Sequence, residues 1–364
     1  MFQLHIIKLI KLTNSVIMKK SATFLAILFI FNCGYSQKIH SNFEILKLME
    51  ASKLKYEIKT LDKPIANSDY SGKLNQADCY RVVSDSGLIT YPYKMNDPAS
   101  KKLQKAEMYF QANDIDNALI WYKSTLEADS SLFIMMTYIG QMYEKKRDPV
   151  NAINWYKKAI GKNYIDYMAH WFLADNYKSV NDIENAVDEI VIARILNRNN
   201  PRIRKSFDNI FMKAKRDTTD WYFNPQIKIE SPSDNTVSIA MNDKWVGYAM
   251  AKALWMFEPG YSESMGVKKG LYSTLEDREC LVSLLIGQLN AKTKINGDPE
   301  FLILKQAVKN NFLEEYILYE IVLPKTPAVA YQLPEKTILG IKNYILDVRN
   351  IKEQVKNPMS NMIG

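Results

Sequence analysis

Three consecutive stretches of the chain repeat one residue pattern with a period of about 34 residues: Ala99–Ile134, Ile134–Met168 and Met168–Pro201. Small, aromatic and polar residues recur at equivalent positions in all three. The clearest columns are Ala106, Gly140 and Ala174; Tyr109, Tyr143 and Tyr177; Asp114, Asp148 and Asp182; Asn117, Asn151 and Asn185; and Ala118, Ala152 and Ala186. Because these columns keep one register without a gap, the pattern indicates an internal repeat.

Each repeat predicts two amphipathic helices joined by a short turn. Ala106 and Tyr109 lie three positions apart and Ala118 lies four before Tyr122, so each pair falls on one helix face. Asp114 stands where the second helix begins, and its side-chain oxygen can accept from the first free backbone amides. A single hairpin of this kind cannot bury its apolar face, so the units are expected to stack.

These columns resemble the tetratricopeptide repeat (TPR) family, whose unit has small residues, a Tyr, an Ala and an aromatic at these positions. The resemblance covers about 100 of the 364 residues. It implies a mainly α fold, a TPR-type α-solenoid of helical hairpins over residues 99–200. A further helical stretch, Arg202–Lys215, is expected to cap the array.

The resemblance also implies a binding groove, because the first helix of each unit lines the concave side in this family. The groove would hold an extended or helical peptide. Its expected positions are Leu103, Glu107, Phe110, Ile134, Thr137, Gln141, Glu144, Met168, Trp171, Asp175 and Lys178. The same residues could instead pack under the N-terminal segment or the C-terminal domain, and the sequence leaves both possibilities open.

One specialised ligand is not expected in this groove. TPR proteins that clamp C-terminal carboxylates use Lys, Arg and Asn at positions that hold Glu107, Tyr138, Met168 and Phe172 here. The expected partner is therefore a protein or peptide segment rather than a free chain terminus.

The N-terminus has the three parts of a secretory signal. Met18-Lys19-Lys20 precedes an apolar run, Ala22–Phe31, and small residues follow up to Ser36. The run of about ten residues is too short to span a bilayer, which takes about 20. We expect residues 1–36 to be removed, with Met18 the suspected true start, and the protein to be periplasmic or extracellular. Cleavage before Cys33 and its lipidation would instead give an outer-membrane lipoprotein, although Asn32 stands where a small residue is usual.

The remaining chain divides into an N-terminal segment (37–98), the repeats with their capping helix (99–216), a C-terminal domain (217–355) and a tail (356–364). The first is expected to open with a helix from Phe43 to Ile58 and to become irregular beyond Asp62. The C-terminal domain is expected to be mostly helical with a β-hairpin. Its predicted elements are strands Gln226–Glu230 and Thr236–Met241 and helices Trp245–Phe257, Ser273–Leu289, Asp298–Leu323 with a break near Asn310–Asn311, and Glu335–Arg349.

The sequence predicts no catalytic, cofactor-binding or metal-binding residue. His40 and His170 lack metal-ligand spacing, and no Gly-rich phosphate loop, Cys-x-x-Cys or Gly-x-Ser-x-Gly motif occurs. The net charge of +8 falls to about +4 without the four leader lysines, so no nucleic-acid partner is expected. Cys79 and Cys280 could pair in an oxidising compartment or remain two separate thiols.

The sequence thus predicts an exported TPR protein that acts as a protein-protein interaction module or scaffold in the bacterial cell envelope. One alternative is an enzyme or small-ligand-binding protein whose site lies in the C-terminal domain. There Lys252 lies in an apolar helix, with Glu258 six residues on, and a Lys beside carboxylates can do acid/base chemistry. Glu279, Glu315 and Glu320 lie on neighbouring helical patterns. A further alternative is a structural subunit of an envelope assembly.

Overall fold

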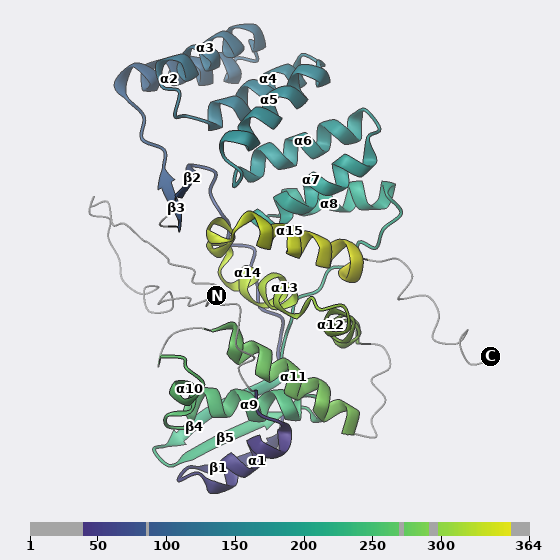
Figure 1. Cartoon of the computed structure of the whole chain (residues 1–364). Helices are drawn as coiled ribbons and strands as arrows, with labels where there is room; N and C mark the ends of the chain where they lie inside the picture. Colours follow the sequence, from purple (N-terminus) through teal and green to yellow (C-terminus); the bar gives the residue numbers. More distant parts are fainter. Residues whose placement is uncertain (1–38, 85–86, 269–272, 291–297, 351–364) are drawn as a thin grey trace, which may run out of the picture. The chain divides into compact units, whose positions relative to one another are not determined.

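The structure, a computed structural model, describes residues 39–84, 87–268, 273–290 and 298–350 (Figure 1). These residues form two compact units. The array unit comprises Asp69–Asp220 and the chain from Leu318 onward. The sheet unit comprises the chain up to Ser68 and Trp221–Ile317.

The array unit is built from stacked helical hairpins, so the predicted α-solenoid is confirmed (Figure 1). Helices α2 and α3, α4 and α5, and α6 and α7 form three hairpins, and α8 packs on α7. Their bounds are α2 Asp97–Gln111, α3 Ile115–Ala128, α4 Ile134–Lys145, α5 Pro149–Lys162, α6 Tyr167–Ser179, α7 Ile183–Leu196 and α8 Pro201–Lys213.

The turn inside each hairpin is capped as the sequence predicts. Asp114 Oδ1 accepts from the backbone N–H of Asn117 at 3.1 Å, and Asn117 Nδ2 donates to the other carboxylate oxygen at 2.7 Å. Asp148 and Asp182 make the same pair of bonds with the asparagine three positions on. The Asp and Asn columns therefore form one reciprocal N-cap, repeated in every unit.

The capping helix continues the repeat register. The residue before each capping aspartate has a left-handed backbone, at Asn113, Arg147 and Asn181, and Lys215 follows at the same interval with φ 57°. The backbone N–H of Arg216 donates to Phe211 O at 2.9 Å, as that of Asp182 does to Tyr177 O. Helix α8 is thus the first helix of a fourth unit, which lacks its second helix.

The array begins at α2 because the free side of that helix is polar. Lys101 and Lys105 are exposed, and Met108 is 56% exposed. The equivalent positions of α4 are buried against the preceding hairpin, as Met135, Ile139 and Met142. A polar outer face at the terminal helix keeps the end of a repeat array soluble.

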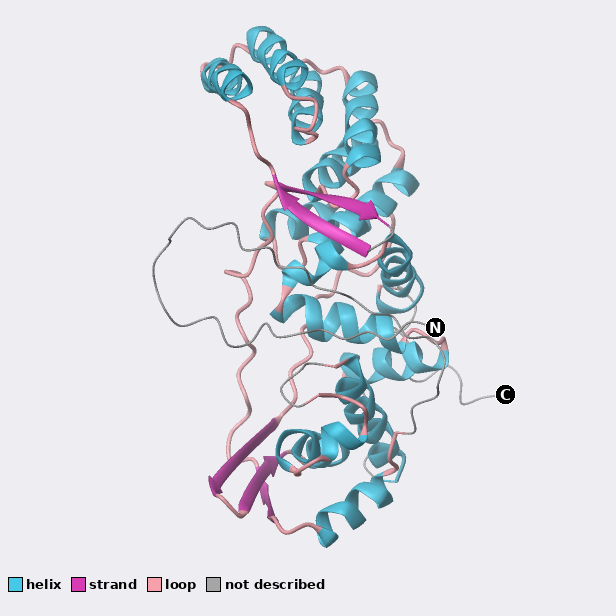
Figure 2. Ribbon diagram, turned by 60° about the vertical axis from the view of Figure 1, so that its left-hand side comes forward, coloured by secondary structure: helices cyan, strands magenta, loops and turns pink. Residues whose placement is uncertain are grey.

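Residues 75–84 and 87–96, here called the strap, run along the loops that join one unit to the next. They contain an antiparallel hairpin that the sequence did not predict, β2 Cys79–Ser84 and β3 Gly87–Pro92 (Figure 2). Asn197 binds the backbone of Asn75 through both its oxygen and its nitrogen. Asn163 likewise accepts from Arg81 N–H at 3.2 Å and donates to Cys79 O at 3.0 Å.

Residues 318–350, here called the C-terminal segment, cover α7. They consist of the end of a π-helical turn (η2, Ile317–Val322), α14 (Leu323–Lys325), a 3₁₀ helix (η3, Pro327–Gln332), α15 (Glu335–Tyr344) and a second π-helical turn (η4, Ile345–Arg349). Helix α15 packs on α7, and Lys342 pairs with Asp188 at 3.0 Å. Residues 190–199 of α7 and its end are all buried, unlike the exposed outer face of α5.

The sheet unit has a three-stranded sheet of order β1-β5-β4. Strand β1 (Lys55–Thr60) is parallel to β5 (Thr236–Met241), and β4 (Ile227–Ser233) is antiparallel to it. The predicted hairpin is therefore confirmed. The helices are α1 Asn42–Ala51, α9 Val246–Phe257, α10 Tyr261–Ser264, α11 Thr274–Asn290, α12 Pro299–Lys309 and α13 Leu313–Tyr316, with a 3₁₀ turn, Asp243–Trp245, before α9.

The predicted helix Phe43–Ile58 is wrong in its second half. Its capping box at Ser41 is present, but the helix ends at Ala51. The run Lys55–Thr60 alternates polar and apolar residues, and that period of two suits a strand. β1 pairs along its whole length with β5 instead.

The predicted segment boundaries also differ from the compact units. The N-terminal segment divides after Ser68, so its helix and strand belong to the sheet unit and the strap belongs to the array unit. The predicted C-terminal domain divides after Ile317. The predicted break at Asn310–Asn311 is present, since Asn311 has φ 61° between α12 and α13. Within the described ranges, no helix combines the length and the apolar character that crossing a membrane requires.

We expect Gly140→Ala to lower the free energy of unfolding by about 1–3 kcal/mol, the usual cost of overpacking a core. A Cβ on Gly140 would lie 2.5 Å from Cε1 of Tyr156, a fully buried ring. Gly161→Ala is the matched control, because nothing lies within 4 Å of a Cβ there and helix propensity favours Ala. Urea unfolding followed by circular dichroism measures both, and an equal response of the two variants would contradict the packing argument.

Candidate functional site

The predicted groove residues lie at equivalent positions on the first helices α2, α4 and α6, a surface we call the first-helix face. Glu144 is exposed there, and most of the others are half-buried: Leu103, Glu107, Phe110, Gln141, Met168, Trp171, Asp175 and Lys178. Thr137 is fully buried and donates to Asp166 Oδ2 at 2.6 Å. The prediction that Thr137 lines the groove is therefore wrong, and Ile134, 8% exposed, is also part of the core.

Hydrogen bonds connect α6 to α8 on this face. Trp171 Nε1 donates to Ser206 Oγ at 2.8 Å, and the Ser206 hydroxyl donates to Asp175 Oδ2 at 2.9 Å. Lys178 pairs with Asp175 Oδ1 at 2.7 Å. Asp175 and Lys178 thus neutralise each other, and Trp171 is fixed in orientation.

The carboxylates of the first two units are held by uncharged donors. Tyr122 OH donates to Glu107 at 2.7 Å. Glu144 accepts from Tyr156 OH at 3.0 Å and from Asn176 Nδ2 at 3.2 Å. Burial, together with the neighbouring carboxylate, raises the pKa of each tyrosine, so both remain donors. Within the described residues no ion pair neutralises Glu107 or Glu144.

Helix α8 adds residues to the first-helix face that sequence reasoning missed. Arg202, Lys205, Asn209 and Met212 stand one repeat length after Met168, Trp171, Asp175 and Lys178, and all four are exposed. The sequence did contain a signal for these residues, because the 34-residue spacing of the repeat continues without a gap as far as Lys215. Treating this stretch only as a cap left its outward side out of the expected groove.

Other surfaces of the array are occupied by the chain itself. The strap binds the loops at Asn163 and Asn197, and Asn96 Nδ2 donates to Asp129 at the first loop. The C-terminal segment covers α7. In the described part of the chain, none of the strap's hydrogen bonds goes to Glu107, Gln141 or Asp175, and these three side chains are half-buried.

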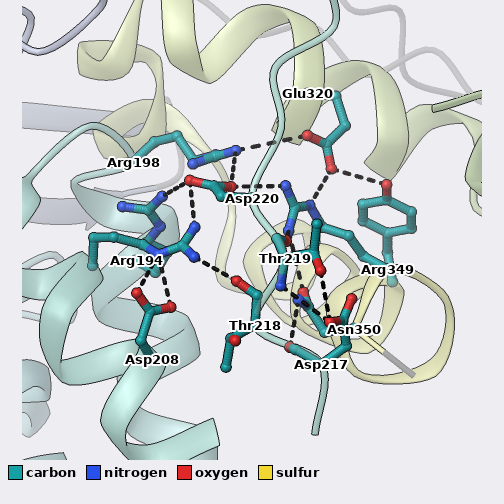
Figure 3. Close-up of polar contacts among 12 residues, drawn as sticks. Arg194, Arg198, Asp208, Asp217, Thr218, Thr219, Asp220, Glu320, Arg349 and Asn350 are labelled. Carbon is teal, nitrogen blue, oxygen red and sulfur yellow. Dashed lines mark hydrogen bonds and ion pairs between the residues drawn. The ribbon is translucent and has the colours of Figure 1, made fainter. Parts of the chain in front are cut away.

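A buried ionic cluster ties the C-terminal segment to the array (Figure 3). Asp220 accepts from Arg194 at 2.9 Å and from Arg349 at 3.0 Å, and it also pairs with Arg204 and, at 3.6 Å, with Arg198. Burial alone would raise the pKa of Asp220, but the four guanidinium groups outweigh it and hold that pKa well below the ordinary value.

Glu320 is the second anion of this cluster. It accepts from Arg349 Nε at 2.6 Å and from Tyr344 OH at 3.0 Å, and it lies 3.7 Å from Arg198 (Figure 3). Arg349 and Glu320 come from the C-terminal segment, whereas Arg194 and Arg198 come from α7 and its end. Because the charges are paired across this junction, the cluster acts as an ionic clamp.

In the sheet unit, Lys252 of the catalytic alternative has a carboxylate partner. Lys252 pairs with Glu276. Burial lowers the pKa of Lys252, but the charges of Glu276 and Asp277 raise it more, so the net pKa lies above the ordinary value and the amine keeps its proton. Glu258 accepts from Ser52 Oγ at 2.6 Å and from Tyr56 OH at 2.7 Å, which ties it into the fold.

The other predicted groups have structural partners. Glu279 is fully buried and accepts from Trp255 Nε1, Tyr261 OH and the backbone N–H of His40. His170 is buried against Glu189. Cys79, in the array unit, and Cys280, in the sheet unit, are free cysteines. Among the residues that the structure describes, no cluster of His, Cys, Asp and Glu could hold a metal ion.

Comparison with known proteins gives matches among solved structures alone. No family model and no curated protein matches the chain. The first TPR domain of Spaghetti (RPAP3), bound to an HSP90 peptide, is 17% identical, with 34% of this chain and 99% of that chain covered and a TM-score of 0.32. The Yersinia enterocolitica secretion chaperone SycD, in complex with a peptide of the translocator YopD, is 14% identical (33% and 96% covered, TM-score 0.31). YrrB, described as a TPR protein with an unusual peptide-binding site, is 15% identical (58% and 92% covered, TM-score 0.29).

The family assignment of the repeats agrees with the geometry above. The repeating columns, the capped hairpins and their stacking make residues 99–200 three tetratricopeptide repeats, followed by the first helix of a fourth.

We expect Asp220→Asn to lower the free energy of unfolding by about 3–5 kcal/mol, because it leaves buried arginines without their counter-charge. Since the folded state lowers the pKa of Asp220, its stabilising contribution is complete above the ordinary aspartate pKa of about 3.9 and is lost as the pH falls below it. Chemical unfolding at pH 7 and at pH 3 measures both effects.

Asp116→Asn is the matched control for this experiment. Asp116 pairs with Lys146 on the surface, where its side chain is 77% exposed, so its loss is expected to cost less than about 1 kcal/mol. Comparable losses for Asp116→Asn and Asp220→Asn would refute the assignment of the cluster as a clamp.

Proposed function

We propose that this protein is a protein-protein interaction module whose partner binds the first-helix face of its TPR array. One observation carries the proposal. Four successive first helices present exposed or half-buried side chains in a single register, while the strap and the C-terminal segment occupy the loops and the outer side of α7.

The chemistry of this face suits a polypeptide segment. Phe110 on α2 and Met168 and Trp171 on α6 are half-buried and offer apolar contacts at two places. Gln141 lies between them, and its amide can pair with the backbone of a bound chain. Peptide recognition commonly combines apolar anchor positions with polar groups that satisfy the backbone.

We place this function outside the cytoplasm, in the periplasm or at the surface of a bacterial cell. The support is the sequence alone: a positive start at Lys19-Lys20, an apolar run and small residues before Gln37. A structural subunit of an envelope assembly would use the same face with a permanent partner. We propose no reaction: Lys252 is paired with Glu276, and Glu258 accepts hydrogen bonds from Ser52 and Tyr56.

Photo-cross-linking from the first-helix face tests the binding proposal. A photoreactive phenylalanine replaces Gln141 in one protein and Asn209 in another, since neither side chain makes a bond that the fold needs in the described structure. We expect both proteins to form a covalent adduct with the same partner in envelope extract. Asn154, exposed on the second helix α5, carries the reagent in the control protein and is expected to give no such adduct.

A blocking variant completes the test. Gln141→Trp fills the middle of the face and is expected to abolish the adduct formed at Asn209, whereas Asn154→Trp leaves it unchanged. Adducts that form equally at Asn154, or that persist in Gln141→Trp, would mean that the partner binds elsewhere.

The proposed export has a separate measurement. Mass spectrometry of the N-terminal peptide from the natural host is expected to find a chain that starts near Gln37 in the envelope fraction. A chain that keeps Met1 or Met18 and stays in the cytoplasmic fraction would rule export out, and a diacylated Cys33 would show the lipoprotein alternative instead.

A further inference from the structure

We infer that the partner segment is an extended chain with a basic residue and an acidic residue about six positions apart and an apolar residue between them. This inference rests on the proposed function and specifies the chemistry of the ligand. It follows from how charge is distributed along the first-helix face.

The first two units supply the negative end of this face. Glu107 on α2 is half-buried and Glu144 on α4 is exposed, and both accept hydrogen bonds from uncharged donors. Lys145 Nζ lies 5.5 Å from the centroid of the Phe110 ring, so one cation also lies at this end. The two carboxylates outnumber it and favour a cationic side chain of the ligand over a neutral one.

The third unit is neutral and apolar. Asp175 and Lys178 are paired with each other, so they offer little net charge to a ligand. Trp171 is half-buried, and its indole nitrogen is already bonded to Ser206, which leaves the ring as a contact surface. Met168 lies one turn earlier on the same helix. An apolar side chain of the ligand fits this region.

The fourth helix supplies the positive end. Arg202 and Lys205 are exposed on α8 and stand one repeat length after Met168 and Trp171. Among the described residues, no ion pair neutralises either of them. This part of the face therefore favours an anionic side chain.

The spacing follows from the packing of the first helices. α4 packs on α6, and α6 packs on α8. Packed helices lie about 8–10 Å apart, so α4 and α8 are separated by about 20 Å. An extended chain covers about 3.3 Å per residue, which gives about six residues between a basic residue placed at Glu144 on α4 and an acidic residue placed at α8.

Fluorescence anisotropy with labelled 12-residue peptides tests the inference on the chain from Gln37 to Gly364. One peptide carries Lys and Glu six positions apart around a Leu, a second carries them side by side, and a third has neither. We expect the spaced peptide to bind at least about fivefold more tightly than the other two, and the difference to shrink at high salt.

Two sets of variants locate the charges. Arg202→Glu with Lys205→Glu is expected to weaken the spaced peptide about tenfold and to strengthen a peptide in which Lys replaces the Glu. Glu107→Gln with Glu144→Gln keeps the acceptor for each tyrosine and is expected to weaken the spaced peptide severalfold. Lys158→Glu with Lys162→Glu on α5 is the control for net charge, since both lysines are exposed away from the face.

The outcomes separate this inference from the function on which it rests. If Gln141→Trp abolishes peptide binding but the charge variants behave like the α5 control, the face binds a partner and the charge pattern is wrong. Equal binding of all three peptides to the unaltered protein, or no binding, overturns the inference, and the cross-linking from Gln141 and Asn209 then decides the proposed function alone. If neither Gln141→Trp nor the charge variants alter binding, both are refuted.

Discussion

A helical hairpin of this repeat has apolar sides that it cannot bury by itself, and stacking leaves such sides uncovered at the two ends of the array. The two ends of the array avoid an exposed apolar side in different ways. At the first unit the free side of α2 is polar, with Lys101 and Lys105 in columns that are buried in later units. At the last unit the apolar surface of α7 is kept and covered by α15. The need to cover the apolar side of α7 explains why the C-terminal segment packs on the array.

Arg194, Arg198 and Arg349 are buried where the C-terminal segment covers α7, and Asp220 supplies a counter-charge for them. A buried guanidinium without a counter-charge is costly, and pairing with a carboxylate offsets part of that desolvation cost. Arg198 and Asp220 precede the C-terminal segment, whereas Arg349 and Glu320 belong to it. The pairs Arg349–Asp220 and Arg198–Glu320 therefore require the segment to be docked. The ionic contacts therefore specify where the segment binds, in addition to the apolar contacts of α15.

The sequence predicted the features that repeat. Asp114, Asp148 and Asp182 cap as expected because a capping aspartate acts on its own turn, and the hairpin around residues 231–235 formed because its signal is local. Long-range pairing was not predictable in this way. β1 pairs with β5, which lies about 180 residues further along the chain. The strap is held by the amide side chains of Asn163 and Asn197, and nothing near these asparagines in the sequence indicates which backbone groups they bind. The apolar run Ile190–Leu196 at the end of α7, interrupted by Arg194 alone, is the sign in the sequence that this helix is covered.

The same reasoning explains what could be said of the candidate site. The positions that line the groove in TPR proteins predicted most residues of the first-helix face. The prediction failed at Thr137, whose side chain is buried and whose hydroxyl donates to Asp166. The predicted positions also stopped one helix early, at Lys178, although the register continues into α8. The fourth helix matters because it reverses the sign of the charge along the face: Glu107 lies at one end and Lys205 at the other. A face with opposite charges at its ends also gives a bound chain a direction, because a segment with one basic and one acidic residue fits it in a single orientation.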